Sequence, residues 1–269
     1  MLQAMIHGKL TREEEGLEDL LTSNTFGLMK YLPPKAVLLP FLSLAKDPLR
    51  KHSLASWLQG AIKIERLLFW PTLTHTDCFS CEPDVAIVFL HDDGTKTWVL
   101  IEAKYRSGKS SEAIVGIEKP NDQLAREFDN LKNISQHKGI MHYALVYLTT
   151  DYICPKNELE ESANEYKQKR DSSPNLYWLS WRMLYDVLEL SDYSENSIIE
   201  DLKNFMLNLN LTMFRRLRFE DLKKPEWSFE RIPKYWSWSI LKPNWIFMRK
   251  ELSWNWFPFP KPEKWYFLK

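Results

Sequence analysis

The residues whose types and spacing suggest chemistry lie in one stretch, EPDVAIVFLHDDGTKTWVLIEAK, which runs from Glu82 to Lys104. Two runs rich in β-branched and aromatic residues flank an Asp-Gly turn signal, a pattern typical of a β-hairpin. If the turn centres on Asp93, antiparallel pairing places Asp84 directly across from Glu102. Lys104 shares a face with Glu102, because successive side chains of a strand alternate between faces. The spacing therefore predicts that two carboxylates and one ammonium group converge at one end of the hairpin.

The other residues of this hairpin indicate that its two strands are buried. Residues 85–90 and 98–101 form near-continuous apolar runs, as expected of central strands that are covered on both faces. Charges at the end of such a hairpin are costly unless they are paired or bind a metal. Two acidic oxygen donors beside a lysine suit a hard divalent cation such as Mg²⁺ or Mn²⁺, with the lysine near an attacking water. The alternative interpretation is a salt bridge at the edge of an ordinary sheet.

The charged residues of the hairpin also carry a resemblance to a known family. Pro83-Asp84, a strand, a turn and then Glu102-Ala103-Lys104 resemble the PD-(D/E)XK motif of restriction-endonuclease-like nucleases. The resemblance implies that Asp84 and Glu102 hold Mg²⁺ or Mn²⁺ directly, with the Ala103 carbonyl as a further ligand. It implies that Lys104 positions or activates the water that attacks phosphorus. The implied activity is hydrolysis of DNA, with RNA as the other candidate substrate, in a setting such as phage defence or a mobile element.

A helix predicted near the N-terminus supplies a further acidic candidate. Over residues 11–32, leucines and aromatic residues fall near helical spacing, and acidic residues stand at the start, where the helix dipole favours them. The segment LEDLLTSNTFGLMKYL resembles the first helix of PD-(D/E)XK proteins, in which a carboxylate faces the metal. The resemblance implies this role for Glu18, with Asp19 as the neighbour that could take it instead. The alternative is a solvated acidic face ahead of a core helix.

The stretch that follows the hairpin combines a loop with a second helix. The loop is rich in turn residues, and its residues Tyr105, Arg106 and Lys109 either contact phosphates or belong to an ordinary solvated loop. A helix is predicted to begin at Asn121 or Asp122, both good N-cap residues. Related nucleases often place a glutamine of this helix near the metal or the scissile phosphate, which implies such a role for Gln123, whereas the alternative is an exposed glutamine. Position 127 holds Glu where one branch of the family has Tyr.

The order of predicted elements indicates the fold class. Residues 11–211 are expected to form a helix, apolar segments, the hairpin, a helix, two strands and two helices. This order is close to the αβββαβ core of restriction-endonuclease-like folds, an α/β architecture in which helices flank a mixed β-sheet. We therefore expect a nuclease-like domain over residues 1–211, followed by a C-terminal extension over residues 212–269.

The C-terminal extension has a distinct composition. Seven of the 12 tryptophans lie between residues 227 and 265, where WSWS and WNWF alternate in the manner of strands and suggest a small hairpin or meander. Residues 212–269 hold 13 Lys and Arg against 6 Asp and Glu, a charge of +7, whereas the remainder holds 23 against 30, a charge of −7. A basic extension on an acidic body suits an enzyme that acts on a polyanion. The extension is expected to stack on nucleic acid, to form an interface with a partner subunit or a second copy, or to pack on the body.

Composition also bears on compartment. A hydrophobic content of 44% and a charged content of 27% are those of a globular protein rather than a disordered one. Three cysteines, an odd number, argue against a disulfide framework and favour a reducing cytoplasm. No apolar run approaches the roughly 20 residues needed to span a bilayer, and the first ten residues lack a signal-peptide core. The sequence thus predicts a cytoplasmic protein without a membrane partner.

Two other classes of function remain open from the sequence. One is a protein that keeps the nuclease fold and binds nucleic acid without cleaving it. The other is an assembly protein whose Trp-rich extension makes the essential contacts, with a structural acidic cluster.

Overall fold

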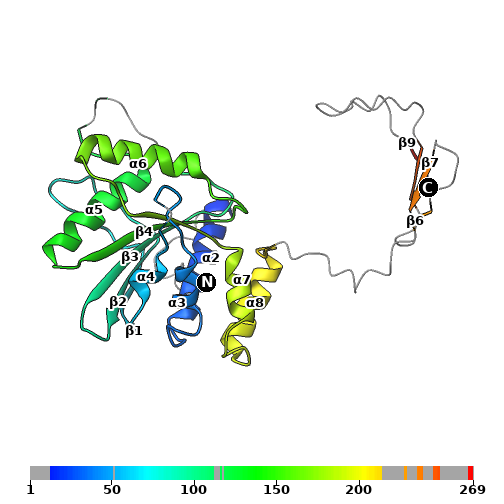
Figure 1. Cartoon of the computed structure of the whole chain (residues 1–269), viewed down its shortest axis with the longest axis horizontal. Coiled ribbons are helices and arrows are strands. Elements are labelled where there is room, and N and C mark those ends of the chain that lie inside the picture. The colour runs from blue at the N-terminus through cyan, green and yellow to red at the C-terminus, as the bar shows by residue number, and fades with distance from the viewer. Residues whose placement is uncertain are drawn as a thin grey trace. The chain divides into compact units, whose positions relative to one another are not determined.

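The computed structural model of the chain describes residues 13–50, 52–111, 116 and 118–213, together with four short strands between residues 227 and 268. The chain divides into two compact units, Met1–Met213 and Phe214–Lys269, which are drawn in Figure 1. The division predicted from composition falls two residues before this one, and the roles predicted for the two parts stay predictions. Among the described residues, no helix has both the length and the apolar character needed to cross a membrane.

A five-stranded mixed sheet forms the centre of the first unit. Its strands stand in the order in which they occur along the chain, namely β1 (Ala61–Phe69), β2 (Val85–His91), β3 (Lys96–Ala103), β4 (His142–Thr149) and β5 (Leu176–Ser180). The pairs β1–β2 and β2–β3 are antiparallel, whereas β3–β4 and β4–β5 are parallel. Because β2 and β3 are interior strands, their long apolar runs are buried as the sequence predicted.

Helices cover both faces of this sheet (Figure 1). One apolar core lies between the sheet and a first set of helices, α2 (Glu13–Met29), α3 (Leu38–Ser43), α4 (Ala55–Leu58), α7 (Met183–Glu189) and α8 (Ser197–Asn208). A second core lies on the opposite face, against α5 (Gln123–His137) and α6 (Lys156–Arg170). The fold is therefore a mixed α/β sandwich of three layers. Its assignment to the restriction-endonuclease-like class stays a prediction.

The register of the central hairpin is the one that the sequence predicted. Val85 pairs with Ile101 and Leu90 pairs with Lys96, so the turn centres on Asp93. Gly94 completes this turn with a φ of +80°, in the left-handed region that glycine enters without a Cβ penalty. Continuing the same register by one step places residues 84 and 102 opposite each other on the face covered by α5.

Two contacts fix the helices that approach the end of this hairpin. Trp181, which follows β5, is fully buried against Phe26 of α2 and Phe41 of α3, at ring-centroid distances of 5.8 and 6.5 Å. On the other face, Asp122 caps α5 by accepting a hydrogen bond from the backbone N–H of Ala125. The helix start predicted at Asn121 or Asp122 is thus confirmed at the second of these residues, and both helices are held in place by buried groups.

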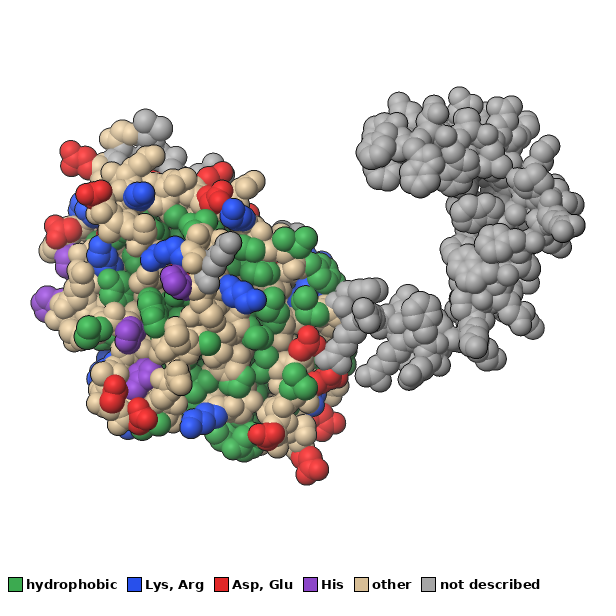
Figure 2. Space-filling view, in the orientation of Figure 1, with side chains coloured by type: hydrophobic (Ala, Val, Ile, Leu, Met, Phe, Trp, Pro, Cys, Tyr) green, Lys and Arg blue, Asp and Glu red, His purple; other side chains and the backbone are tan. Residues whose placement is uncertain are grey.

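The surface of the first unit mixes both signs of charge. Acidic and basic side chains are interspersed over the face shown in Figure 2, among hydrophobic and uncharged polar groups. The buried acidic residues of the unit include Asp84, Glu102 and Glu127.

In the second unit, four strands form an antiparallel sheet in the order β6 (Trp227–Ser228), β7 (Tyr235–Trp238), β8 (Trp245–Met248) and β9 (Tyr266–Leu268). Strand formation at WSWS, which the alternation predicted, is confirmed by β7 and its pairing with β8. WNWF and Trp265 lie outside the described residues. Whether this extension binds nucleic acid, a partner subunit or the first unit stays a prediction.

Candidate active site

Asp84, the first predicted site residue, is anchored between the ends of three strands. Its Oδ2 accepts a hydrogen bond from the backbone N–H of Ala103 at 2.8 Å, and its Oδ1 accepts one from the Trp70 indole at 3.1 Å. Trp70 follows β1 directly and has a φ of 46°, in the left-handed region that non-glycine residues rarely adopt. The carboxylate is buried, so these two donors replace the water that it loses.

Glu102 and Lys104 form the ion pair that the hairpin register implies. The Nζ atom of Lys104 lies 2.7 Å from Oε1 of Glu102, and the two residues are only 7% and 3% exposed. The side-chain amide of Gln123 donates a hydrogen bond to the same Glu102 oxygen. Gln123 is itself oriented by the loop after β3, because its Oε1 accepts the backbone N–H of Ser110 at 2.7 Å.

Glu18 joins this cluster from α2. Its Oε2 accepts hydrogen bonds from the backbone N–H of Tyr105 and the hydroxyl of Ser107, both at 2.7 Å, and its Oε1 lies 3.4 Å from the Lys104 ammonium. The structure thus places all five predicted side chains, Asp84, Glu102, Lys104, Glu18 and Gln123, around the end of one hairpin. Their catalytic roles, and the metal-ligand role of the Ala103 carbonyl, stay predictions.

A further carboxylate, Glu127, lies in the same cluster and was not proposed from the sequence. It stands one helical turn beyond Gln123 on α5 and is 1% exposed. Its Oε2 has no hydrogen-bond partner among the described residues. The available signal was the spacing, because residues four apart on a helix share a face.

The electrostatics of the cluster show an excess of negative charge. Burial raises the pKa of Asp84 and of Glu102, and neighbouring carboxylates raise both further. Burial, followed by the Asp84 carboxylate, raises the pKa of Glu127 to about 8. Burial disfavours the charged form of Lys104, but Glu102 and Glu18 outweigh it and hold the pKa of this ammonium above its ordinary value. One ammonium therefore faces four carboxylates.

The donor chemistry of the cluster fits a hard divalent cation, which prefers carboxylate, carbonyl and amide oxygens. Two of the carboxylates, Glu102 and Glu18, contact the Lys104 ammonium. The described part of the chain contains no group of three or more His, Cys, Asp or Glu side chains already placed as ligands of one ion. Both oxygens of Asp84 accept hydrogen bonds, whereas Oε2 of Glu127 is an orphaned buried acceptor. The residues therefore fit a hard divalent cation in two respects. Their donor atoms are oxygens, and the Oε2 atom of Glu127 has no other partner among the described residues.

The structure corrects the phosphate contact expected of Lys109 in the loop after β3. Its Nζ lies 2.7 Å from Oδ2 of Asp122 and also donates to the carbonyl of Glu158 and the hydroxyl of Ser162. Its side chain is only 4% exposed. The Lys109 side chain is therefore not placed to contact phosphates, whereas its neighbours Arg106, Ser107 and Gly108 are exposed, as expected of a solvated loop. Lys109 ties the loop to α5 and α6, and its burial by α6 could not be read from the local sequence.

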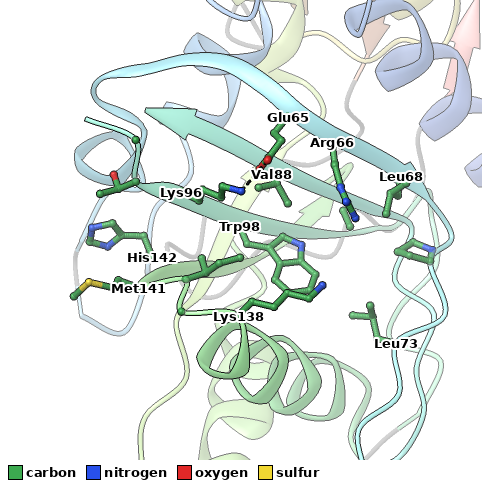
Figure 3. Close-up of a pocket in the computed structure, with 16 residues that line it drawn as sticks. Glu65, Arg66, Leu68, Leu73, Val88, Lys96, Trp98, Lys138, Met141 and His142 are labelled. Atoms are coloured by element: carbon green, nitrogen blue, oxygen red, sulfur yellow. Dashed lines mark hydrogen bonds and ion pairs between the residues drawn. The ribbon is translucent and has the colours of Figure 1, made fainter. Parts of the chain in front are cut away.

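A groove of about 660 Å³ opens on the sheet between β1, β2, β3 and the end of α5 (Figure 3). Arg66, Lys96 and Lys138 line it, and the Trp98 indole lies among them. The Lys138 ammonium is 5.2 Å from the Trp98 ring centroid, whereas Lys96 is paired with Glu65 at 2.7 Å.

The groove and the acidic cluster lie on the same face of the sheet. Ala86 lines the groove and is two residues from Asp84, so the two side chains point to one side of the strand. Trp98 and Glu102 are four residues apart along β3, so their side chains also point to one side of the strand. No local sequence pattern indicates this groove, because its lining comes from segments that only the fold brings together.

Comparisons with known proteins add little to this geometry. No family model matches the chain. The chain is similar to the uncharacterized protein PM0110 of Pasteurella multocida (strain Pm70), with 25% identity over 217 residues that cover 74% of this chain and 75% of that protein.

Among solved structures, the chain is similar to Pyrococcus furiosus SfsA in complex with Ca²⁺, with 14% identity and a TM-score of 0.26. This match covers 47% of the chain and 51% of SfsA, so it spans about half of that protein. A likeness at this TM-score supports no assignment of function. The support for a function lies in the residues of the cluster itself.

Proposed function

We propose that the chain is a divalent-metal-dependent phosphodiesterase that hydrolyses DNA and belongs to the PD-(D/E)XK nucleases. The observation that carries the proposal is the meeting of Asp84, Glu102 and Lys104 at the end of one hairpin, in the register that the motif requires. Glu18 and Gln123 reach the same place from two different helices. An incidental salt bridge at a sheet edge would not explain four buried or half-buried carboxylates around one lysine.

Each residue has a defined task in this proposal. Asp84, Glu102 and the Ala103 carbonyl would hold Mg²⁺ or Mn²⁺. When bound, such a cation polarises the phosphate and stabilises charge on the leaving oxygen. Lys104, whose pKa Glu102 and Glu18 hold above its ordinary value in spite of burial, would orient the attacking water and balance charge. Glu18 fixes Lys104 and the backbone that follows it.

The test of this function uses the purified full-length chain with supercoiled plasmid and with end-labelled linear DNA. Cleavage is expected with Mg²⁺ or Mn²⁺ and is expected to disappear with EDTA. The Lys104→Ala variant, purified in the same way, should show none and so controls for a contaminating nuclease. DNA binding without cleavage by the wild type in both cations would overturn the proposal in favour of a non-catalytic nucleic-acid-binding protein. A parallel arm with RNA decides between the two substrates.

The groove gives a separate prediction about DNA binding. Arg66 and Lys138 are both exposed at its rim, so they are placed to neutralise phosphates of a strand that lies along this face of the sheet (Figure 3). Reversing both charges, with Arg66→Glu and Lys138→Glu together, is expected to weaken DNA binding roughly tenfold or more and to reduce the salt dependence of log K by about 2. Fluorescence anisotropy with a labelled duplex in EDTA, at several salt concentrations, measures both quantities.

The matched control for this experiment reverses two lysines elsewhere, Lys156 of α6 and Lys203 of α8, and so gives the same net charge. This control is expected to bind DNA with nearly the affinity of the wild type. Equal losses in the two double variants would show that net charge, and not the groove, determines binding.

A further inference from the structure

Among the buried acidic residues that the structure describes, Glu127 differs from the others because one of its carboxylate oxygens has no hydrogen-bond partner. Six others are matched by hydrogen-bond donors or cations: Asp47, Asp84, Glu102, Asp122, Asp129 and Glu165. Glu127 is as deeply buried as any of them, yet its Oε2 has no hydrogen-bond partner among the described residues. A buried carboxylate oxygen without a donor is costly, so its retention calls for a physical reason.

The charged neighbours of Glu127 indicate why its carboxylate oxygen is kept without a donor. Its electrostatic neighbours include Asp84 and Glu102, the two residues proposed to hold the cation, and the adjacent Arg126. Lys104 attracts Glu127 but is already paired with Glu102 at 2.7 Å. A third carboxylate at this position repels the first two, and its side-chain hydrogen bond with Glu102 leaves its Oε2 without a partner among the described residues. Additional positive charge among the three carboxylates would relieve this repulsion and give the Oε2 atom of Glu127 a partner.

We propose that Glu127 is a ligand of the catalytic cation and supplies Oε2 to it from α5. This inference rests on the proposed function, because it assumes a divalent cation between Asp84 and Glu102. It adds a ligand from a helix to the ligands from the hairpin, at a position for which the PD-(D/E)XK resemblance offered none. The geometric support is that Glu127 is 1% exposed and stands one helical turn beyond Gln123, whose amide contacts Glu102.

The experiment measures cation binding directly, without DNA and without reference to activity. Mn²⁺ is titrated into the full-length chain, and free Mn²⁺ is followed by electron paramagnetic resonance. The melting temperature of each cation-free protein is measured in parallel. Glu127→Gln keeps the size and hydrogen-bonding capacity of the side chain but removes its charge. We expect at least a roughly tenfold rise in the Kd for Mn²⁺, with a cation-free melting temperature equal to or above that of the wild type.

The matched control is Asp129→Asn, which removes a buried carboxylate from the same helix. Asp129 is paired with Arg170, with the closest N–O distance at 2.6 Å, and is therefore already matched. This control is expected to lower the melting temperature and to leave Mn²⁺ affinity unchanged at a temperature where it is folded. A ligand role changes the Mn²⁺ affinity without lowering the melting temperature, whereas a structural role lowers the melting temperature and leaves the Mn²⁺ affinity unchanged.

The outcomes distinguish this inference from the proposed function. Unchanged Mn²⁺ affinity in Glu127→Gln, with normal binding by the wild type, would overturn the ligand role and leave the proposed function standing. Weaker binding together with a lower melting temperature would assign Glu127 a structural role and would also overturn the inference. Absence of Mn²⁺ binding by the wild type would overturn the proposed function itself.

Discussion

Glu102→Gln is expected to lower the rate of divalent-dependent DNA cleavage about 10³-fold. Glu102 is the central group of the cluster, because its Oε1 contacts both Lys104 and Gln123. Glutamine preserves the shape and the acceptor but lacks the charge that attracts a divalent cation. Single-turnover cleavage of labelled DNA at saturating enzyme measures the chemical step separately from binding.

The control for this variant is Glu65→Gln. Glu65 lies on β1 in the same sheet and is also paired with a lysine, Lys96, at 2.7 Å, but the pair is at the surface of the groove. Its cleavage rate is expected to stay within about threefold of the wild-type rate, because surface ion pairs contribute little. A Glu102→Gln variant that retained a tenth of the wild-type rate would contradict the proposed ligand role.

Trp181→Ala is expected to lower the free energy of unfolding by about 3–5 kcal/mol, the range for truncating a large buried aromatic residue. Trp181 is fully buried between Phe26 and Phe41, so alanine would leave a cavity where α2, α3 and the end of β5 meet. Urea denaturation followed by circular dichroism measures the loss. Because Trp181 also positions α2, which carries Glu18, some loss of activity is expected as well.

A second substitution at the same position separates cavity formation from hydrogen bonding. The Trp181 indole N–H is buried and has no acceptor among the described residues. Trp181→Phe removes this unpaired donor and keeps an aromatic ring, so its destabilisation is expected to be less than half that of alanine. Equal losses in the two variants would show that the indole makes a contact that packing alone does not explain.

The hairpin could be predicted in register from the sequence because its information is local. The Asp-Gly turn, the apolar runs, Asp84 and Glu102 all lie within 23 residues. The alternation of side chains along a strand then determines which of them share a face. The placement of Glu18 and Gln123 required the resemblance to a family, because no local rule relates a helix to the end of a distant hairpin.

The features missed from the sequence all depend on long-range packing. Trp70 donates to Asp84 only because β1 ends beside β2, and its indole gave no signal of this contact. Glu127 was noted as a departure from a family pattern and not as a member of the cluster. For Lys109, the phosphate contact was wrong because α6 covers the side chain and supplies acceptors for its ammonium. Each case depends on a contact between residues far apart in the chain.

The Lys104–Glu102 contact has a consequence for how the protein exists in the cell. The lysine is an internal counterion, covalently present at all times, that compensates part of the acidic cluster before any metal arrives. We therefore expect the polypeptide to reach its native state in metal-free buffer, unlike zinc fingers, which are unfolded without their ion. Loading then becomes a reversible step that follows folding, so the ambient concentration of free divalent ion would set how many molecules are competent at a given moment.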